Sequence, residues 1–200
     1  KHISRIFAWT SVLAGLLLGS CSNRKADLIA GEAGFTVAYF SAADLNAALR
    51  DTACARLRFY DARRTSKDAQ GSVILIGERA DTTELSGVPY KLYDKLASST
   101  AVSISLSKAD AHVRCMYVTA PQKRYCAEFS RREVATLMGA AGCGGIQLMP
   151  KMTTRGFWSM EMSPVRFSGS TATVLTSVPP VFCTSPCPDM CGPMGDYINY

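Results

Sequence analysis

Histidine is nearly absent from this 200-residue chain, which contains only His2 and His112. The scarcity excludes histidine-rich metal sites and leaves His112 as the one candidate for a Ser-His-Asp or Cys-His arrangement outside the N-terminal segment. The motifs G-x-S-x-G and H-E-x-x-H and the P-loop are missing as well. A lone histidine entering a strand is more often a surface residue than a general base. The residues therefore predict no catalytic site.

The apolar run near the N-terminus is too short to cross a bilayer. It extends from Ile6 to Leu18, 13 residues, whereas a transmembrane helix needs about 20. Lys1 and Arg5 precede it, as the charged region of a signal peptide does. We therefore predict that residues 1–20 are a signal peptide that is removed. Because the sequence opens on Lys rather than Met, we expect the true start to lie upstream.

The stretch Leu17-Leu18-Gly19-Ser20-Cys21 resembles the lipobox of bacterial lipoproteins. In that family the cysteine is diacylated, the signal is cut off before it, and the new amine is usually acylated. The resemblance implies a covalent lipid on Cys21, and no cofactor is expected. Two or three acyl chains anchor a protein stably, since each buried CH₂ contributes about 0.8 kcal/mol. An ordinary secretory signal with an incidental cysteine is the alternative.

The resemblance to bacterial lipoproteins also implies a location, which depends on the residues that follow Cys21. Ser22 in place of Asp implies sorting to the outer membrane, and the basic pair Arg24-Lys25 favours the periplasmic face. Loss of residues 1–20 lowers the formal charge from +6 to +4. This is consistent with attraction to anionic lipid or peptidoglycan, although solubility is the usual explanation. Membrane lipid is therefore an expected partner, and nucleic acid is not.

The body of the chain contains an internal repeat. Phe40-Ser41-Ala42-Ala43-Asp44-Leu45 returns 89 residues later as Phe129-Ser130-Arg131-Arg132-Glu133-Val134. The register then holds without a gap, so that Cys54 aligns with Cys143. This pattern predicts a duplicated α-β-β unit, over about residues 40–77 and 129–162. Chance similarity is the alternative, because identity is confined to a few anchor positions.

Each repeated hexapeptide is predicted to begin a helix. Ser-x-x-Asp and Ser-x-x-Glu are capping boxes, and the flanking apolar residues have the spacing of a hydrophobic staple. An alternating strand follows, in which Leu57 and Phe59 face inward, like Ile146 and Leu148 in the second copy. Second strands are predicted at Ser72–Gly77 and Phe157–Met162. The predicted fold class is α+β, an antiparallel sheet with helices on one face, built from two related α-β-β units.

The segments between the units are predicted from local pattern. Phe35–Phe40 is interpreted as a strand leading into the first capping box, and Tyr90–Leu96 as a short helix. Strands are predicted at Ala101–Leu106 and Val113–Val118. The domain organisation is then a signal peptide (1–20), a lipidated tether (21–34), the duplicated domain (35–177) and a Pro/Cys-rich tail (178–200).

Seven cysteines remain after Cys21, and outside the cytoplasm they are expected to pair where geometry permits. Cys115 and Cys126 lie on either side of the Ala120-Pro121 turn, which suggests a cross-strand disulfide. Cys54 and Cys143 are either small buried residues or partners of the tail cysteines. Because seven is odd, at least one thiol stays free or pairs with another chain.

The tail cysteines Cys183, Cys187 and Cys191 follow a C-x3-C-x3-C pattern. This is neither a zinc spacing nor the ferredoxin run, so no metal site is predicted. We expect disulfides, with Cys54 or Cys143 as partners, to pin the tail, since its prolines leave little backbone hydrogen bonding.

One basic patch is a candidate binding site. It comprises Arg56, Arg58, Tyr60, Arg63 and Arg64. Exposed on a strand face, it could grip an anionic glycan or a partner protein; a solvated strand face is the ordinary interpretation.

The predicted function is that of an outer-membrane lipoprotein, a non-enzymatic accessory subunit or binding module of an envelope protein complex. The alternative is a thiol-dependent or hydrolytic envelope enzyme that uses a tail cysteine or His112.

Overall fold

The computed structural model describes residues 35–65, 67, 71–85, 90–93, 101–119, 126–152 and 158–183. The strands are β1 (Ala38–Ser41), β2 (Arg56–Ala62), β3 (Ser72–Glu78), β4 (Tyr90–Tyr93), β5 (Val102–Ile104), β6 (Cys126–Ser130), β7 (Gly145–Met152), β8 (Trp158–Ser168), β9 (Thr171–Val174) and β10 (Val181–Phe182). The helices are α1 (Ala42–Ala48), α2 (Leu106–Thr119) and α3 (Arg131–Met138). Within these ranges, no helix combines the length and the apolar character that crossing a membrane requires.

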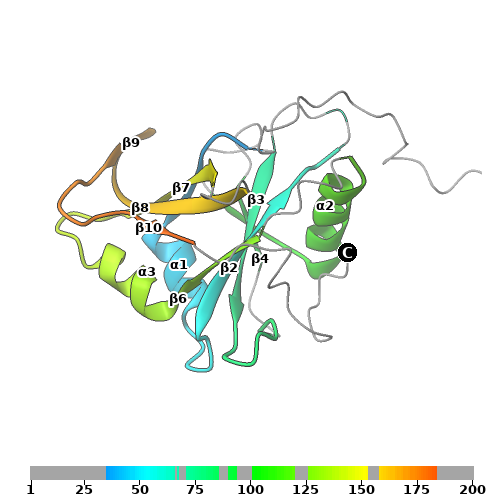
Figure 1. Ribbon diagram of the computed structural model, residues 1–200, viewed down its shortest axis with the longest axis horizontal. Helices are drawn as coiled ribbons and strands as arrows, with labels where there is room; N and C mark the ends of the chain where they lie inside the picture. The colour runs from blue at the N-terminus through cyan, green and yellow to red at the C-terminus, as the bar shows by residue number, and fades with distance from the viewer. Residues whose placement is uncertain are drawn as a thin grey trace, which may run out of the picture.

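The strands form two antiparallel sheets that cross steeply (Figure 1). Sheet A has the order β1-β7-β8-β10, with β9 also paired to β8, and sheet B has the order β5-β4-β3-β2-β6. Because β10 pairs with β8, sheet A continues past residue 178, where the tail was predicted to begin. The predicted signal peptide, the tether and residues 184–200 lie outside the described residues.

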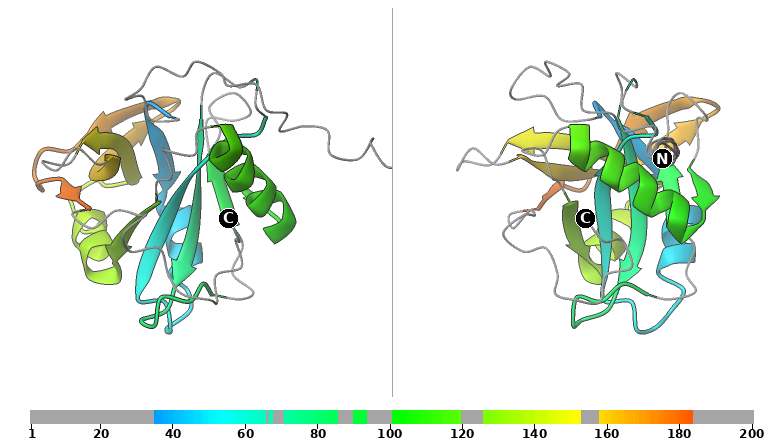
Figure 2. Two further views of the ribbon diagram at one scale, coloured as in Figure 1. Left: turned by 45° about the vertical axis from the view of Figure 1, so that its right-hand side comes forward. Right: turned by 90° about the vertical axis from the view of Figure 1, so that its right-hand side faces the viewer.

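The predicted α+β class is wrong, because the described residues form a mainly β structure. Its helices do not share one face of a sheet. Helices α1 and α3 insert Leu45 and Val134 into the core between the sheets, whereas α2 packs on the opposite side of sheet B (Figure 2). The two capped helices have only 7 and 8 residues, so they act as connections between sheets rather than as a layer.

Two local predictions between the repeats are also wrong. Tyr90–Tyr93, predicted as the start of a helix, is strand β4, which pairs with β3; residues 94–96 lie outside the described residues. Val113–Val118, predicted as a strand, belongs to α2. There Ala109, Val113 and Met116 are buried at the spacing of one helix face. Packing against sheet B overrides the β propensity of Val113–Val118.

The capping boxes are confirmed. Ser41 and Ser130 are the N-caps of α1 and α3. The N–H of Asp44 and that of Glu133 each donate to the cap hydroxyl at 3.2 Å. In return the Ser41 N–H donates to Asp44 at 3.2 Å and the Ser130 N–H donates to Glu133 at 2.7 Å. Phe40, before the first cap, is fully buried.

The two repeats exchange their first strands. β1 pairs with β7 of the second repeat, and β6 pairs with β2 of the first. The registers are equivalent, since Ala38 lies opposite Leu148 just as Ala127 lies opposite Phe59. The junctions match too: the Ala42 N–H donates to the Gly144 carbonyl at 2.7 Å, and the equivalent bond from Arg131 to Ala55 measures 2.8 Å. The pairing therefore relates the repeats by an approximate twofold operation.

The equivalence extends beyond the predicted α-β-β unit. Leu75 of β3 pairs with Lys91 of β4, as Met162 of β8 pairs with Val181 of β10. Each repeat thus contributes a first strand, a helix and at least three further strands. The segment β5–α2 follows β4 in the first repeat.

Sheet B is buried on both sides. The main core lies between the sheets, where the ring of Phe59 meets those of Phe40 and Phe129 edge-on, with centroids 5.5 and 5.8 Å apart. A second core lies between sheet B and α2, and Ile74 and Val113 belong to it. Residues of β2 and β3 that alternation places on the outer face therefore also lie in the interior.

Candidate functional site: a buried charge network on sheet B

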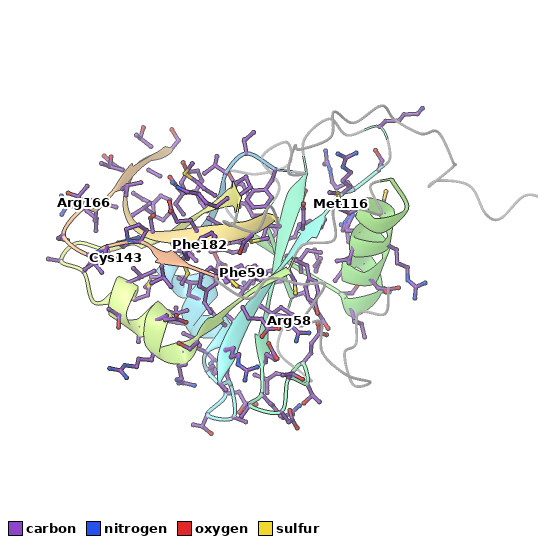
Figure 3. The ribbon with its side chains drawn as sticks, in the orientation of Figure 1. Arg58, Phe59, Met116, Cys143, Arg166 and Phe182 are labelled. Carbon is purple, nitrogen blue, oxygen red and sulfur yellow. The ribbon has the colours of Figure 1, made fainter. Side chains whose placement is uncertain are left out.

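Arg58 is buried on the face of β2 that points away from the main core. Figure 3 shows it on the opposite side of sheet B from Phe59. Its side chain has no exposed surface. The guanidinium donates from Nη2 to Glu78 Oε1 at 3.0 Å and from Nε to Glu128 Oε1 at 3.0 Å. Nη1 donates to the Tyr60 hydroxyl at 3.0 Å. Arg58 thereby links β2 to both of its neighbours, β3 and β6.

Glu84 continues the network from the loop after β3. Its Oε1 accepts from the Tyr60 hydroxyl at 2.6 Å, and its Oε2 accepts from the Tyr90 hydroxyl at 2.8 Å. Its own carbonyl accepts from Arg79 Nη1 at 3.0 Å. Glu84 is fully buried and forms an isolated antiparallel bridge with Glu78. The loop between these residues is therefore held against the outer face of sheet B.

The electrostatics of the network favour a permanent charge on Arg58. Burial disfavours that charge, but Tyr60, Glu78 and Glu128 outweigh the burial and raise the pKa of the guanidinium above its ordinary value. Arg56, whose side chain is 32% exposed, approaches Glu78 Oε1 at 3.3 Å and Glu128 Oε2 at 3.5 Å. Two guanidinium groups are thus paired with two carboxylates, those of Glu78 and Glu128. Removing one buried partner would leave an uncompensated charge in the interior.

The predicted basic binding patch is not a surface patch. Arg58, Tyr60 and Arg63 are buried, and Arg56 and Arg64 are half-buried. Alternation correctly places Arg56, Arg58 and Tyr60 on the outer face of β2, but α2 and the loop after β3 cover that face. This burial removes the reason for expecting an anionic glycan at this patch.

Three acidic members of the network, Glu78, Glu84 and Glu128, were missed from the sequence. One signal was present, because Glu78 directly follows the predicted strand Ser72–Gly77, which neighbours the arginine-bearing strand in the chain. A cross-strand pair of opposite charges is favourable, so a partner for Arg56 could have been assigned there. Glu84 and Glu128 become partners only through the loop after β3 and the exchanged strand β6.

His112 is not the surface residue that was expected. It lies in α2 with 7% of its surface exposed, and its Nδ1 is 3.0 Å from the carbonyl oxygen of Arg63. A carbonyl only accepts, so Nδ1 carries the proton in this contact. The Arg63 N–H in turn donates to the His112 carbonyl at 3.0 Å. This pair of hydrogen bonds fastens α2 to the end of β2.

Cys54 and Cys143 occupy equivalent turns in the two repeats. Each is a free thiol that donates to a backbone carbonyl at 3.1 Å, of Arg56 and of Gly145 respectively. Cys54 is buried, and burial raises the pKa of its thiol. Cys183 is also a buried free thiol, so no bridge joins it to Cys54 or Cys143. Their contacts are those of small structural residues.

The predicted pairing of Cys115 with Cys126 is wrong, because Cys115 is buried in α2 and the expected hairpin does not form. Cys126, at the start of β6, is disulfide-bonded. No disulfide joins two of the described cysteines. The predicted bridge from the tail to Cys54 or Cys143 is wrong, because both thiols are free. Cys21, Cys187 and Cys191 lie outside the described residues, so pinning of the tail by a disulfide to another cysteine stays a prediction. In the described ranges, no group of three or more His, Cys, Asp or Glu side chains is placed to hold a metal ion.

Comparison of the chain with protein-family models, with curated proteins and with solved structures gives no match. The function is therefore inferred from the residues of the chain itself.

Proposed function

We propose that this protein is a lipid-anchored outer-membrane lipoprotein, facing the periplasm, whose body is a non-enzymatic accessory subunit or binding module of an envelope complex. The sequence from Leu17 to Cys21 supports the anchor. Anchoring through two or three acyl chains would leave the folded body beside the membrane, where envelope proteins are its natural partners.

The observation that carries the non-enzymatic role is the internal use of reactive side chains. Arg58 is enclosed by Tyr60 and two carboxylates, and both oxygens of Glu84 accept from tyrosine hydroxyls. His112 is buried against a backbone carbonyl. Catalysis by proton transfer needs a base within reach of the substrate. These groups instead tie strands, loop and helix together, which suits a rigid scaffold that presents a surface.

The anchor is tested by Cys21→Ser in the full-length gene, expressed in a Gram-negative host. Cys143→Ser is the matched control, because it removes a thiol remote in sequence from the lipobox. We expect acylated, membrane-bound protein from the parent and the control. The Cys21→Ser variant should remain unprocessed or soluble. Mass spectrometry of the N-terminal peptide decides: a processed, membrane-bound parent without acyl mass contradicts the anchor.

The accessory role is tested by purification of the parent from membranes in mild detergent, with and without prior chemical cross-linking. We expect a partner in a fixed ratio that is lost or reduced with Cys21→Ser, since the anchor brings the two proteins together. A parent that purifies alone in both cases would contradict the accessory role and leave the anchor untouched.

A further inference from the structure

The ribbon formed by β8 and β9 projects from sheet A (Figure 1). The two strands are joined by a tight turn in which Gly169 has φ 59°, a conformation that favours glycine. Residues 166–171 are all exposed, so side chains on both faces of the ribbon's tip meet solvent. The ribbon is nevertheless held at its base. Arg166 donates to the Ala141 carbonyl at 3.5 Å, and the ring of Phe167 meets that of Tyr39 edge-on at 6.2 Å.

The outer edge of β9 has no partner strand in the part of the chain that the structure describes. Among the described residues β9 pairs with β8 alone. Edge strands are usually protected by charged side chains, proline, bulges or shortness. Residues 170–176, Ser-Thr-Ala-Thr-Val-Leu-Thr, contain no charge and no proline. β9 itself has four residues, and the edge strands of sheet B, β5 and β6, have three and five. Of these protections, β9 has only shortness. The β9 edge therefore has the character of a pairing surface.

The backbone pattern of β9 fixes which groups face outward. The Leu175 N–H donates to the Pro164 carbonyl at 2.8 Å. Hydrogen-bonding groups of alternate residues point in opposite directions, so Thr173 also directs its groups toward β8. Ala172 and Val174 direct theirs to the open edge. An antiparallel strand centred on Thr173 would meet these donors and acceptors in register.

An apolar strip reaches this edge. Val165 and Phe167 lie opposite Val174 and Ala172 on one face of the ribbon. Phe167 is 36% exposed and Val174 is 40% exposed. A Cβ on Gly145 would come within 2.9 Å of the Phe167 ring, so the ring is seated closely on the sheet. Another strand beyond β9 would cover the end of this strip.

We propose that β9 pairs antiparallel with β9 of a second copy of this chain, about a twofold axis at Thr173, and so joins two A sheets into one. The segment is self-complementary, because in this register Ala172 faces Val174 of the other copy and Thr173 faces its own equivalent. No like charges meet within residues 170–176. The apolar strips of the two copies become continuous. The inference goes beyond the proposed function and depends on neither the anchor nor an envelope partner.

The test is the mass of the full chain in mild detergent, measured by analytical ultracentrifugation over a concentration series. We expect a dimer for the parent. Thr173→Lys places two like charges opposite each other and should weaken dimerisation by about tenfold or more. Ser168→Lys is the control, since it adds the same charge to the exposed ribbon one strand away from the axis, and it should dimerise like the parent.

Thr173→Cys gives an independent readout. In a non-hydrogen-bonded antiparallel pair the Cα atoms lie about 4.5 Å apart, within disulfide range. We expect a cross-linked dimer under mild oxidation from Thr173→Cys but not from Ser168→Cys. A parent that is monomeric throughout, or a Thr173→Lys dimer as tight as the parent's, overturns the proposal. Occupation of β9 by a segment of another protein in a purified complex would overturn it as well.

Discussion

Arg58 keeps its charge in the interior because its three nitrogen atoms contact groups on three different strands or loops. Nη2 also lies 3.4 Å from the Thr82 carbonyl, and Thr82 adopts a positive φ of 70°. A non-glycine residue in this conformation is uncommon, which indicates that the surrounding contacts hold the loop in place. Arg58 is therefore a residue on which both the sheet and the covering loop depend.

We expect Arg58→Leu to lower the free energy of unfolding by roughly 3–5 kcal/mol, since Glu78 then remains buried without its main partner. Arg56→Leu is the matched control. It removes an arginine that shares the same carboxylates but is partly exposed, and it should cost about 1 kcal/mol or less. Urea denaturation measures both. If both variants lose a similar amount of unfolding free energy, Arg58 is not the main partner of the buried carboxylates.

At the scale of single elements, the two capped helices are the clearest case of the same local chemistry used twice. In each, a buried phenylalanine precedes a serine that ends the strand and caps the helix, and an acid closes the box. Because the helices have 7 and 8 residues, their end contacts are a large share of their hydrogen bonding.

Ser41→Ala and Ser130→Ala should each lower the free energy of unfolding by about 1 kcal/mol, because each removes the acceptor for one amide and one partner of the acid. The equivalence of the repeats implies similar losses. Thr136→Ala, at an exposed position of α3, is the control and should stay within about 0.5 kcal/mol of the parent. Thermal or urea unfolding tests this, and a cap variant as stable as the control would show that the box adds nothing.

At the scale of the whole molecule, the exchange of first strands makes each half of the chain complete the other's sheet. β2 needs β6 from the second repeat, and β7 needs β1 from the first. The main core is shared as well, since residues of both repeats belong to it. The fold is thus a single cooperative unit rather than two lobes in tandem.

We therefore expect separate fragments 1–122 and 123–200 to lack a cooperative unfolding transition, and co-expression to restore a complex with the circular dichroism of the intact chain. Size-exclusion chromatography and thermal melts provide the measurement. A fragment that unfolds cooperatively by itself would show that the exchanged strands are dispensable.

The sequence by itself determined the features that depend on residues three or four positions apart, or on alternation along one strand. The caps of α1 and α3, their start points and the inward side chains Leu57, Phe59, Ile146 and Leu148 follow from such short-range rules. The repeat also could be found this way, since equal local patterns recur at a fixed offset.

Only the tertiary structure decided which strands pair and what covers the outer face of sheet B. Arg58 contacts Glu128, 70 residues away along the chain. Glu128 lies on β6, a strand of the second repeat that pairs with β2 of the first. No local pattern encodes that partner, because the contact depends on how the whole chain closes. Because of the same packing, the segment Val113–Val118, predicted as a strand, belongs to α2. The arginine patch that was predicted on the surface is a buried charge network. Long-range burial outweighs local propensity wherever an element gains a second packed face.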